Sequence, residues 1–183
     1  MPRSGALVFR FLNNNDTGER FVTRYGVART RLAATMLLTL PGLPLLYTGD
    51  EVGAEFEPYD EGPVLSWTDV HGLREHYARL VALRRDQAEL RSERLEILET
   101  SHPESVLAYV RPGDQREDDI IVLLNYDPKP VRAALPATAF IGTRSLLDLI
   151  SGAAVPIASE VPAIELPGWG ARVLRRGTAD AAR

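Results

Sequence analysis

Hydrophobic and polar positions follow different patterns in the two halves of the chain. In the first half, short apolar runs alternate with long stretches of helical spacing. Two short apolar runs, residues 6–12 (ALVFRFL) and 43–47 (LPLLY), each precede a polar, acidic loop and predict strands. Good helix formers fill residues 27–40 between them and predict a helix. Strand, helix and strand in this order predict a parallel βαβ unit whose helix is largely buried. Residues 72–89 then predict an amphipathic helix with an arginine-rich outer face.

The second half has short apolar runs separated by Pro, Gly, Asp and Asn, which favours an antiparallel sandwich of about eight strands. The expected strands are residues 95–100, 105–111, 120–126, 131–135, 145–149, 155–157, 164–166 and 171–175. We expect the fold class to be α/β plus all-β, with one domain over residues 1–91 and an all-β domain over residues 92–183.

Composition narrows the possible functions. The chain has 183 residues, and 25 acidic groups interspersed with 21 basic groups argue against nucleic acid as a partner, because such proteins concentrate Lys and Arg on one face. The absence of cysteine excludes thiolate metal sites, disulfides and a cysteine nucleophile. His71, His76 and His102 lack a metal-ligand spacing, so we expect no metal site.

The chain carries no pattern of a membrane or secreted protein. The N-terminal apolar stretch is too short for a signal peptide. The longest apolar-rich run, residues 33–46, is interrupted by Thr, Pro and Gly and falls short of the ~20 residues that a span needs. We therefore expect a soluble, cytoplasmic chain without a membrane partner.

Candidate chemistry lies in the two loops that follow the predicted parallel strands. Ligands of parallel α/β folds bind at the carboxyl ends of strands, where loops and helix N-termini converge. The first loop offers the carboxylate of Asp16, three amides at residues 13–15, and the cations of Arg20 and Arg24. Such a mixture of hydrogen-bond donors and acceptors suits polyhydroxylated ligands. The alternative is structural, with Asp16 capping the following turn or pairing with Arg20.

Two segments, FLNNNDTGERF (residues 11–21) and LLTLPGLPLLYTGDEVG (residues 37–53), resemble the last two strand–loop units of the α-amylase clan of glycoside hydrolases. Members of that family have a (β/α)8, or TIM-type, barrel followed by a C-terminal β-sandwich. The resemblance implies that residues 1–91 are the end of such a barrel, with its seventh and eighth strands. It also implies that residues 92–183 are the sandwich.

The resemblance assigns roles to residues of the first loop. The family's Asn-His-Asp motif falls on Asn14, Asn15 and Asp16, with Asn15 standing where His is usual. It implies that Asp16 stabilises the transition state, while Asn14, Asn15 and Arg20 contact an α-glucan or maltooligosaccharide substrate. The family's chemistry needs no organic cofactor. Some members bind calcium, but the sequence shows no clustered ligand set, so we expect no cofactor.

Other positions in and near these loops favour structural roles. Asp50 and Glu51 follow the second strand, in a stretch that mostly shapes the barrel mouth in the family. Trp67 could stack on a sugar face, but packing is the favoured interpretation. For the arginines around residues 84–94 we expect a solvated face, because acidic residues offset them.

Two of the family's three catalytic carboxylates have no counterpart in the sequence. Retaining hydrolysis needs a nucleophile and a general acid, which come from strands four and five in the family, and no G-x-R-x-D stretch occurs here. We therefore expect the C-terminal part of an enzyme that is inactive alone. The alternatives are a stand-alone carbohydrate-binding or scaffold module, and one half of a split enzyme. Two strands cannot close a barrel, so we expect the remainder of the barrel, or a homodimer, to cover the open edge.

Overall fold

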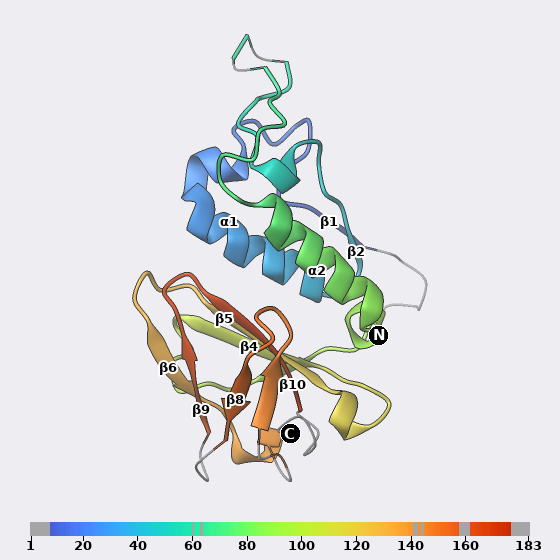
Figure 1. Cartoon of the computed structure of the whole chain (residues 1–183), viewed down its shortest axis with the longest axis vertical. Coiled ribbons are helices and arrows are strands. Elements are labelled where there is room, and N and C mark those ends of the chain that lie inside the picture. Colours follow the sequence, from blue (N-terminus) through green and yellow to red (C-terminus); the bar gives the residue numbers. More distant parts are fainter. Residues whose placement is uncertain are drawn as a thin grey trace. The chain divides into compact units, whose positions relative to one another are not determined.

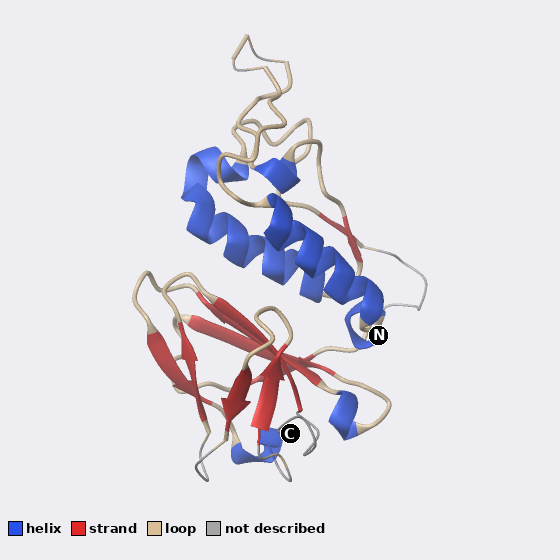
Figure 2. Cartoon of the chain, viewed as in Figure 1, coloured by secondary structure: helices blue, strands red, loops and turns tan. Residues whose placement is uncertain are grey.

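The structure is a computed structural model that describes residues 8–59, 61–62, 64–140, 143, 145–157 and 162–176. The chain divides into two compact units, Met1–Arg85 (unit 1) and Asp86–Arg183 (unit 2). Unit 1 is built mainly from two long helices, and unit 2 mainly from strands (Figure 2). Among the described residues, no helix is both long enough and apolar enough to cross a membrane.

Unit 1 contains a short parallel strand pair, as the sequence predicts. Strand β1 (Phe9–Arg10) pairs in parallel with β2 (Leu43–Pro44), and helix α1 (Phe21–Thr39) connects them. Both strands are shorter than expected, and the residues before 8 lie outside the described part of the chain. Gly42 allows the close pairing, because its φ is +95° and a Cβ there would lie 2.5 Å from the Val8 carbonyl oxygen.

Helix α1 begins earlier than the predicted residue 27. Its regular geometry is interrupted at Gly26, whose φ of 80° is non-helical, and a first turn and a half precedes this residue. The stretch after Gly26 matches the predicted helix and is buried along most of its length, through Thr30, Leu32, Ala34, Thr35, Leu37, Leu38 and Thr39.

Helix α2 (Arg74–Asp86) packs beside α1 (Figure 1). Its buried residues include Tyr77, Leu80 and Leu83, as the helical spacing predicts. The expectation of a solvated arginine face is wrong for Arg84, which is buried. Its guanidinium donates to the carbonyl oxygens of Leu38, Leu40 and Gly42, at 2.9, 3.0 and 2.5 Å. Arg84 therefore binds the end of α1, because the last carbonyls of a helix have no partner within the helix.

We expect His76 on α2 to make the stability of unit 1 sensitive to acid. Burial lowers the pKa of His76, and the Arg31 and Arg79 charges act in the same direction. The hydrogen bond between His76 Nε2 and the Arg31 carbonyl oxygen, at 3.0 Å, acts in the opposite direction and offsets only part of this effect. The unfolded chain then binds more protons than the folded chain below the unfolded pKa of about 6.5. The free energy of unfolding of unit 1 should therefore decrease as the pH falls below that value.

Urea unfolding followed by Trp67 fluorescence in a Trp169→Phe background measures this effect, because Trp67 is then the only tryptophan. His76→Gln should flatten the pH dependence, whereas His102→Gln, which changes a histidine of unit 2, should leave it unchanged. Equal pH dependence in the His76→Gln variant and the parent would contradict the prediction.

Unit 2 is an antiparallel β-sandwich (Figure 1). Its larger sheet has the strand order β3-β4-β5-β10-β7-β8, and its smaller sheet pairs β6 with β9. All eight expected strands are present, and their ends lie within two residues of the ranges expected from the sequence. Their bounds are β3 Glu96–Leu98, β4 Val106–Arg111, β5 Ile120–Asn125, β6 Val131–Ala134, β7 Ser145–Asp148, β8 Ala154–Pro156, β9 Ala163–Leu166 and β10 Ala171–Arg176.

The core of unit 2 lies between its two sheets. Alternate residues of each strand point inward, because successive side chains of a strand face opposite sides. The buried cluster comprises Val106, Ala108, Val110, Ile121, Leu123, Ala133, Leu135, Phe140, Leu146, Ile164, Leu166 and Leu174. Strand β5 is buried along its whole length, which agrees with its uninterrupted apolar run IIVLL. Four short 3₁₀ helices complete the described chain, namely η1 (Asp50–Val52), η2 (Glu89–Arg91), η3 (Arg116–Asp118) and η4 (Ala137–Phe140).

Candidate functional site

The loop after β1 and the loop after β2 are joined by the buried residues Asn13, Arg20 and Asp50 together with the half-buried Tyr47, here called the Arg20–Asp50 cluster. Arg20 Nη2 lies 2.8 Å from Asp50 Oδ1, and both side chains are 1% exposed. Asn13 Nδ2 donates to the same oxygen at 2.7 Å, and the Tyr47 N–H donates to Asp50 Oδ2 at 2.9 Å. The carboxylate therefore accepts three hydrogen bonds from groups on both loops.

The cluster also fixes the start of helix α1. Asn13 Oδ1 accepts a hydrogen bond from the Phe21 N–H at 2.7 Å, which satisfies one of the unpaired amides of the first turn. The Arg20 guanidinium carbon lies 5.0 Å from the ring centroid of Tyr47 and 5.1 Å from that of Phe56, so the cation lies against both aromatic rings. These contacts hold the first loop at both of its ends.

Burial raises the pKa of the Asp50 carboxyl, while the Tyr47 N–H, the Arg20 charge and the Asn13 amide act in the opposite direction. A buried carboxylate is costly unless it is paired and hydrogen-bonded, and these three donors provide that compensation. The structural role expected for Asp50 agrees with this arrangement.

Arg20 does not occupy the position expected of a residue that orients Asp16 or contacts solvent. Its guanidinium donates to Asp50 and to the Thr48 carbonyl oxygen, the latter at 2.9 Å. The cavity beside Arg20 has a volume of only about 10 Å³, which is too small for a sugar. Arg20 therefore positions the loops from inside the fold. The sequence predicted that Arg20 contacts the substrate, and its burial corrects that prediction.

Asp16 lies on the exposed part of the same loop, between the anchored Asn13 and Arg20. A local turn shapes this segment, because Asn14 Oδ1 accepts a hydrogen bond from the Asp16 N–H at 2.8 Å. The Asn15 amide nitrogen donates to Asp16 Oδ1 at 3.1 Å. Asn14 is half-buried, while Asn15 and Asp16 are exposed. The structure thus places these three residues together and directs the carboxylate toward solvent.

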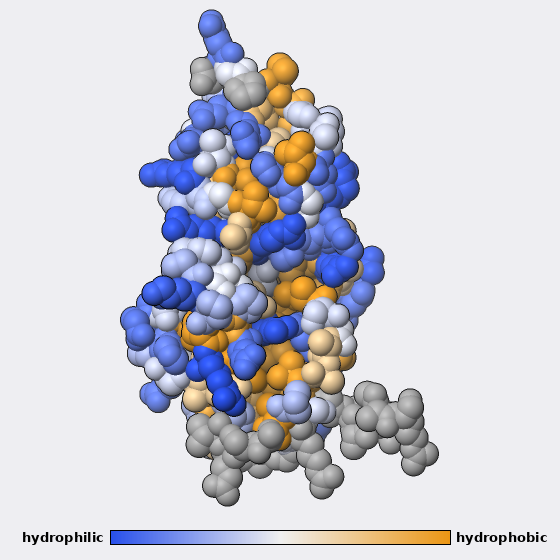
Figure 3. Space-filling view, turned by 60° about the vertical axis from the view of Figure 1, so that its left-hand side comes forward, coloured by the Kyte–Doolittle hydropathy of each residue, from blue (hydrophilic) through white to orange (hydrophobic). Residues whose placement is uncertain are grey.

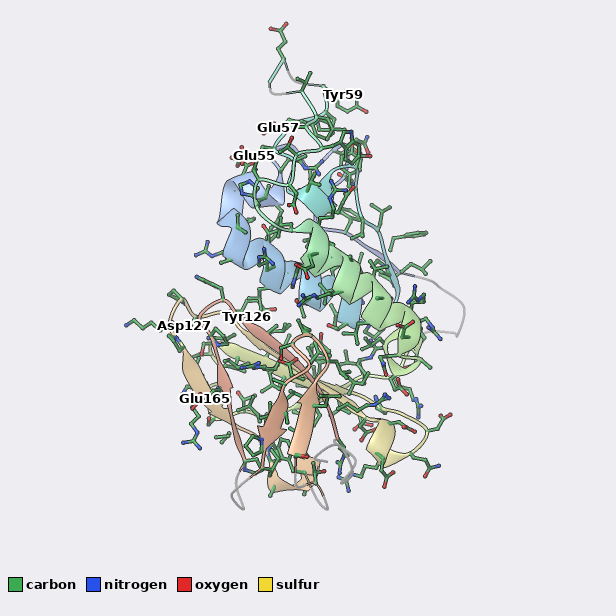
Figure 4. The ribbon with its side chains drawn as sticks, in the orientation of Figure 1. Glu55, Glu57, Tyr59, Tyr126, Asp127 and Glu165 are labelled. Carbon is green, nitrogen blue, oxygen red and sulfur yellow. The ribbon has the colours of Figure 1, made fainter. Side chains whose placement is uncertain are left out.

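Tyr59 is a neighbour of this loop that sequence reasoning missed. It lies on the long loop between η1 and α2, as do Glu55 and Glu57 (Figure 4). Its hydroxyl lies 3.3 Å from Asn15 Nδ2, its side chain is 89% exposed, and its φ of 69° is unusual for a residue other than glycine. No feature of the sequence signals this contact across 44 residues. Trp67, for which packing was expected, is instead 54% exposed.

The described residues contain no group of three or more His, Cys, Asp or Glu side chains arranged to hold a metal ion.

Comparison with known proteins identifies the family. Residues 95–173 match the family described as "Maltogenic Amylase, C-terminal domain". The α-amylase MalA of Haloarcula japonica is 31% identical over 157 residues, which cover 82% of this chain and 22% of MalA. The chain is related to the C-terminal part of family 13-like glycoside hydrolases. The resemblance expected from the residue motifs is confirmed at this level.

Two further relatives extend the comparison. Neopullulanase 2 of Thermoactinomyces vulgaris is 28% identical over 152 residues, covering 79% of this chain and 25% of that protein. The crystal structure of the α-amylase of Geobacillus thermoleovorans, complexed with acarbose, superposes with a TM-score of 0.78 at 19% identity, over 94% of this chain and 39% of that one. This second likeness concerns the fold. The chain spans about a quarter of the length of the curated relatives that it matches.

Proposed function

We propose that the chain supplies the end of the barrel and the C-terminal sandwich of an enzyme that acts on α-glucosidic bonds by a retaining mechanism. Asp16 is its transition-state stabiliser, and the bound substrate is an α-glucan or maltooligosaccharide. The observation that carries the proposal is the exposed Asp16 carboxylate, held at the carboxyl end of a parallel strand by a loop whose two ends are anchored.

The β1–β2 pair supports a place within a larger sheet. Phe9 and Leu43 are register partners, so they lie on one face of the pair together with Phe11 and Leu45. These four side chains are between 37% and 63% exposed in the chain alone. Apolar side chains at this density on a two-stranded sheet are expected to be covered by further strands. On the face that Figure 3 draws, hydrophobic residues are interspersed with hydrophilic ones.

In this proposal Asp16 acts on the sugar rather than as nucleophile or acid. Its carboxylate accepts hydrogen bonds from hydroxyls of the ring being cleaved, and these bonds strengthen as the ring distorts toward an oxocarbenium-like transition state. Asn15 holds Asp16 Oδ1, and Asn14 fixes the turn beneath it. The nucleophile and the general acid come from residues outside this chain. Arg20 and Asp50 act through the loop and touch no substrate.

A direct test begins with the coding sequence upstream of Met1. It should continue in frame through a G-x-R-x-D segment and a later glutamate at a strand end. The longer polypeptide should hydrolyse maltooligosaccharides, and the isolated chain should not. Hydrolysis by the isolated chain would contradict the proposal that the nucleophile and the general acid come from residues outside this chain. A stop codon directly upstream would favour a split enzyme or a stand-alone binding module.

The isolated chain is also expected to self-associate through the β1–β2 face. Phe9→Lys combined with Leu43→Lys should shift the chain toward monomer, because two charges would then face the contact. Sedimentation-velocity ultracentrifugation at several concentrations measures this change. Ile97→Lys, which changes an exposed apolar residue of unit 2, is the matched control and should retain the self-association. A monomeric parent chain at every concentration would contradict the prediction.

A further inference from the structure

Tyr59 contacts the loop after β1 although almost none of its side chain is packed. Its hydroxyl lies 3.3 Å from the Asn15 amide nitrogen, and 89% of the side chain is exposed. A large aromatic side chain at this exposure gains little from burial. Its φ of 69° adds a cost, since residues other than glycine seldom adopt a positive φ. A strained, exposed residue beside a candidate carboxylate indicates a functional role.

The loop that carries Tyr59 (Figure 4) is anchored three residues earlier, at Phe56. The Phe56 ring is stacked beside the Tyr47 ring, with the two centroids 6.5 Å apart. The Arg20 guanidinium carbon lies 5.1 Å from the Phe56 centroid. The loop after β1 is held at both ends by the same Arg20–Asp50 cluster. One buried cluster therefore positions both Tyr59 and the loop that Tyr59 contacts.

The Asn15 side-chain amide links Tyr59 to Asp16. Its nitrogen carries two N–H donors, and Asp16 Oδ1 accepts from it at 3.1 Å and the Tyr59 hydroxyl oxygen at 3.3 Å. If the amide were turned over, its oxygen would face the carboxylate and two acceptors would repel each other. The two bonds together therefore fix the orientation of the Asn15 amide.

A fixed amide at Asn15 restrains the carboxylate of Asp16. An exposed side chain samples several rotamers, and ordering it when a substrate binds costs free energy. Asp16 is restrained at two points, because its N–H donates to Asn14 Oδ1 at 2.8 Å and its Oδ1 accepts from the Asn15 amide. The carboxylate is therefore oriented before any ligand arrives, although it is exposed.

We propose that Tyr59 is a positioning residue that acts through Asn15 to hold the Asp16 carboxylate in its reactive orientation. This role rests on the function proposed above, because it concerns the chemistry of Asp16. The Tyr59 hydroxyl fixes the Asn15 amide, the amide holds Asp16 Oδ1, and Oδ2 accepts from a hydroxyl of the substrate. Geometry that is in place before the reaction lowers the barrier of the chemical step. Loss of the Tyr59 hydroxyl should therefore reduce kcat rather than substrate binding.

The first test uses the isolated chain and needs no activity. ¹⁵N relaxation of the Asn15 side-chain amide gives its order parameter, which distinguishes a fixed group from a mobile one. Tyr59→Phe removes only the hydroxyl and should lower this order parameter to below about 0.6. Tyr25→Phe is the matched control, because Tyr25 is another exposed tyrosine of unit 1, and it should leave the order parameter unchanged. Equal order parameters in Tyr59→Phe and the parent would overturn the proposal.

The second test measures kinetics in the longer enzyme that this chain is proposed to complete. Tyr59→Phe should lower kcat for a maltooligosaccharide by about tenfold and change KM by less than about twofold, because one positioning hydrogen bond is lost. In an Asn15→Ala background the same substitution should have no further effect, since the amide through which Tyr59 acts is absent. Tyr25→Phe should keep the kcat of the parent.

The kinetic outcomes distinguish failure of the positioning role from failure of the proposed function. If Asp16→Asn abolishes hydrolysis while Tyr59→Phe keeps the kcat of the parent, the positioning role is overturned and the proposed function stands. Nearly full activity of Asp16→Asn would overturn both. Full kcat in Tyr59→Phe together with a raised KM in Tyr59→Ala would overturn the positioning role in favour of direct contact between the ring and the sugar.

Discussion

Replacing Arg20 by methionine is expected to lower the free energy of unfolding of unit 1 by about 3–5 kcal/mol, because the Asp50 carboxylate would remain buried without its ion-pair partner. Asp50 is 1% exposed, and the 2.8 Å contact with Arg20 Nη2 offsets part of its desolvation. Removing that charge leaves the Asn13 amide and the Tyr47 N–H as donors. Burial already raises the pKa of Asp50, and loss of Arg20 should raise it further.

Urea unfolding in a Trp169→Phe background measures this loss through Trp67, which lies in unit 1. Arg24→Met is the matched control, since Arg24 is an exposed arginine in the first turn of α1, the helix that follows Arg20. It should change the unfolding free energy by less than about 0.5 kcal/mol. The double variant Arg20→Met/Asp50→Leu should recover much of the loss, because it leaves no buried charge. A loss below about 1 kcal/mol for Arg20→Met would show that the pair contributes no more than an exposed ion pair.

The strands of unit 2 could be predicted because local pattern and burial agree there. Strand β5 is an uninterrupted apolar run and is buried on both faces, and the turns around it contain Gly, Pro, Asp or Asn. The pairing order β3-β4-β5-β10-β7-β8 could not be predicted in the same way. Which strand lies beside β5 is decided by contacts between residues far apart in the sequence, such as Val173 with Val122.

In unit 1 the sequence predicted the order of elements but not the partners of its charged residues. Arg84 was expected on a solvated face, although it lies four residues after Leu80 on the buried face of α2. It is buried there because the end of α1 presents carbonyls that need donors. Arg20 was expected to contact substrate or, in the structural alternative, to pair with Asp16, but it pairs with Asp50 across 30 residues. Short-range pattern identifies the residue types available for a site. The folded chain decides which of them face inward.

Neighbouring polar residues of the candidate site therefore have different roles. Asn13, Arg20 and Asp50 are enclosed and hold the loop, whereas Asn15 and Asp16 are exposed on it. A substitution in the first group should therefore affect stability, and a substitution in the second should affect chemistry. Asp16→Asn separates the two effects, because it keeps the size of the side chain and removes only the charge.

In the longer enzyme that this chain is proposed to complete, Asp16→Asn is expected to lower kcat/KM for a maltooligosaccharide by about 10³-fold or more, equivalent to ~4 kcal/mol of transition-state stabilisation. The loss should appear mainly in kcat, since the carboxylate binds the distorted ring more strongly than the ground state. Glu19→Gln, which neutralises another exposed carboxylate of the same loop, should change kcat/KM less than about twofold. The unfolding free energy of both variants should match that of the parent, because both side chains are exposed. An Asp16→Asn variant with nearly full activity would assign Asp16 to the turn, and the structural alternative would then hold.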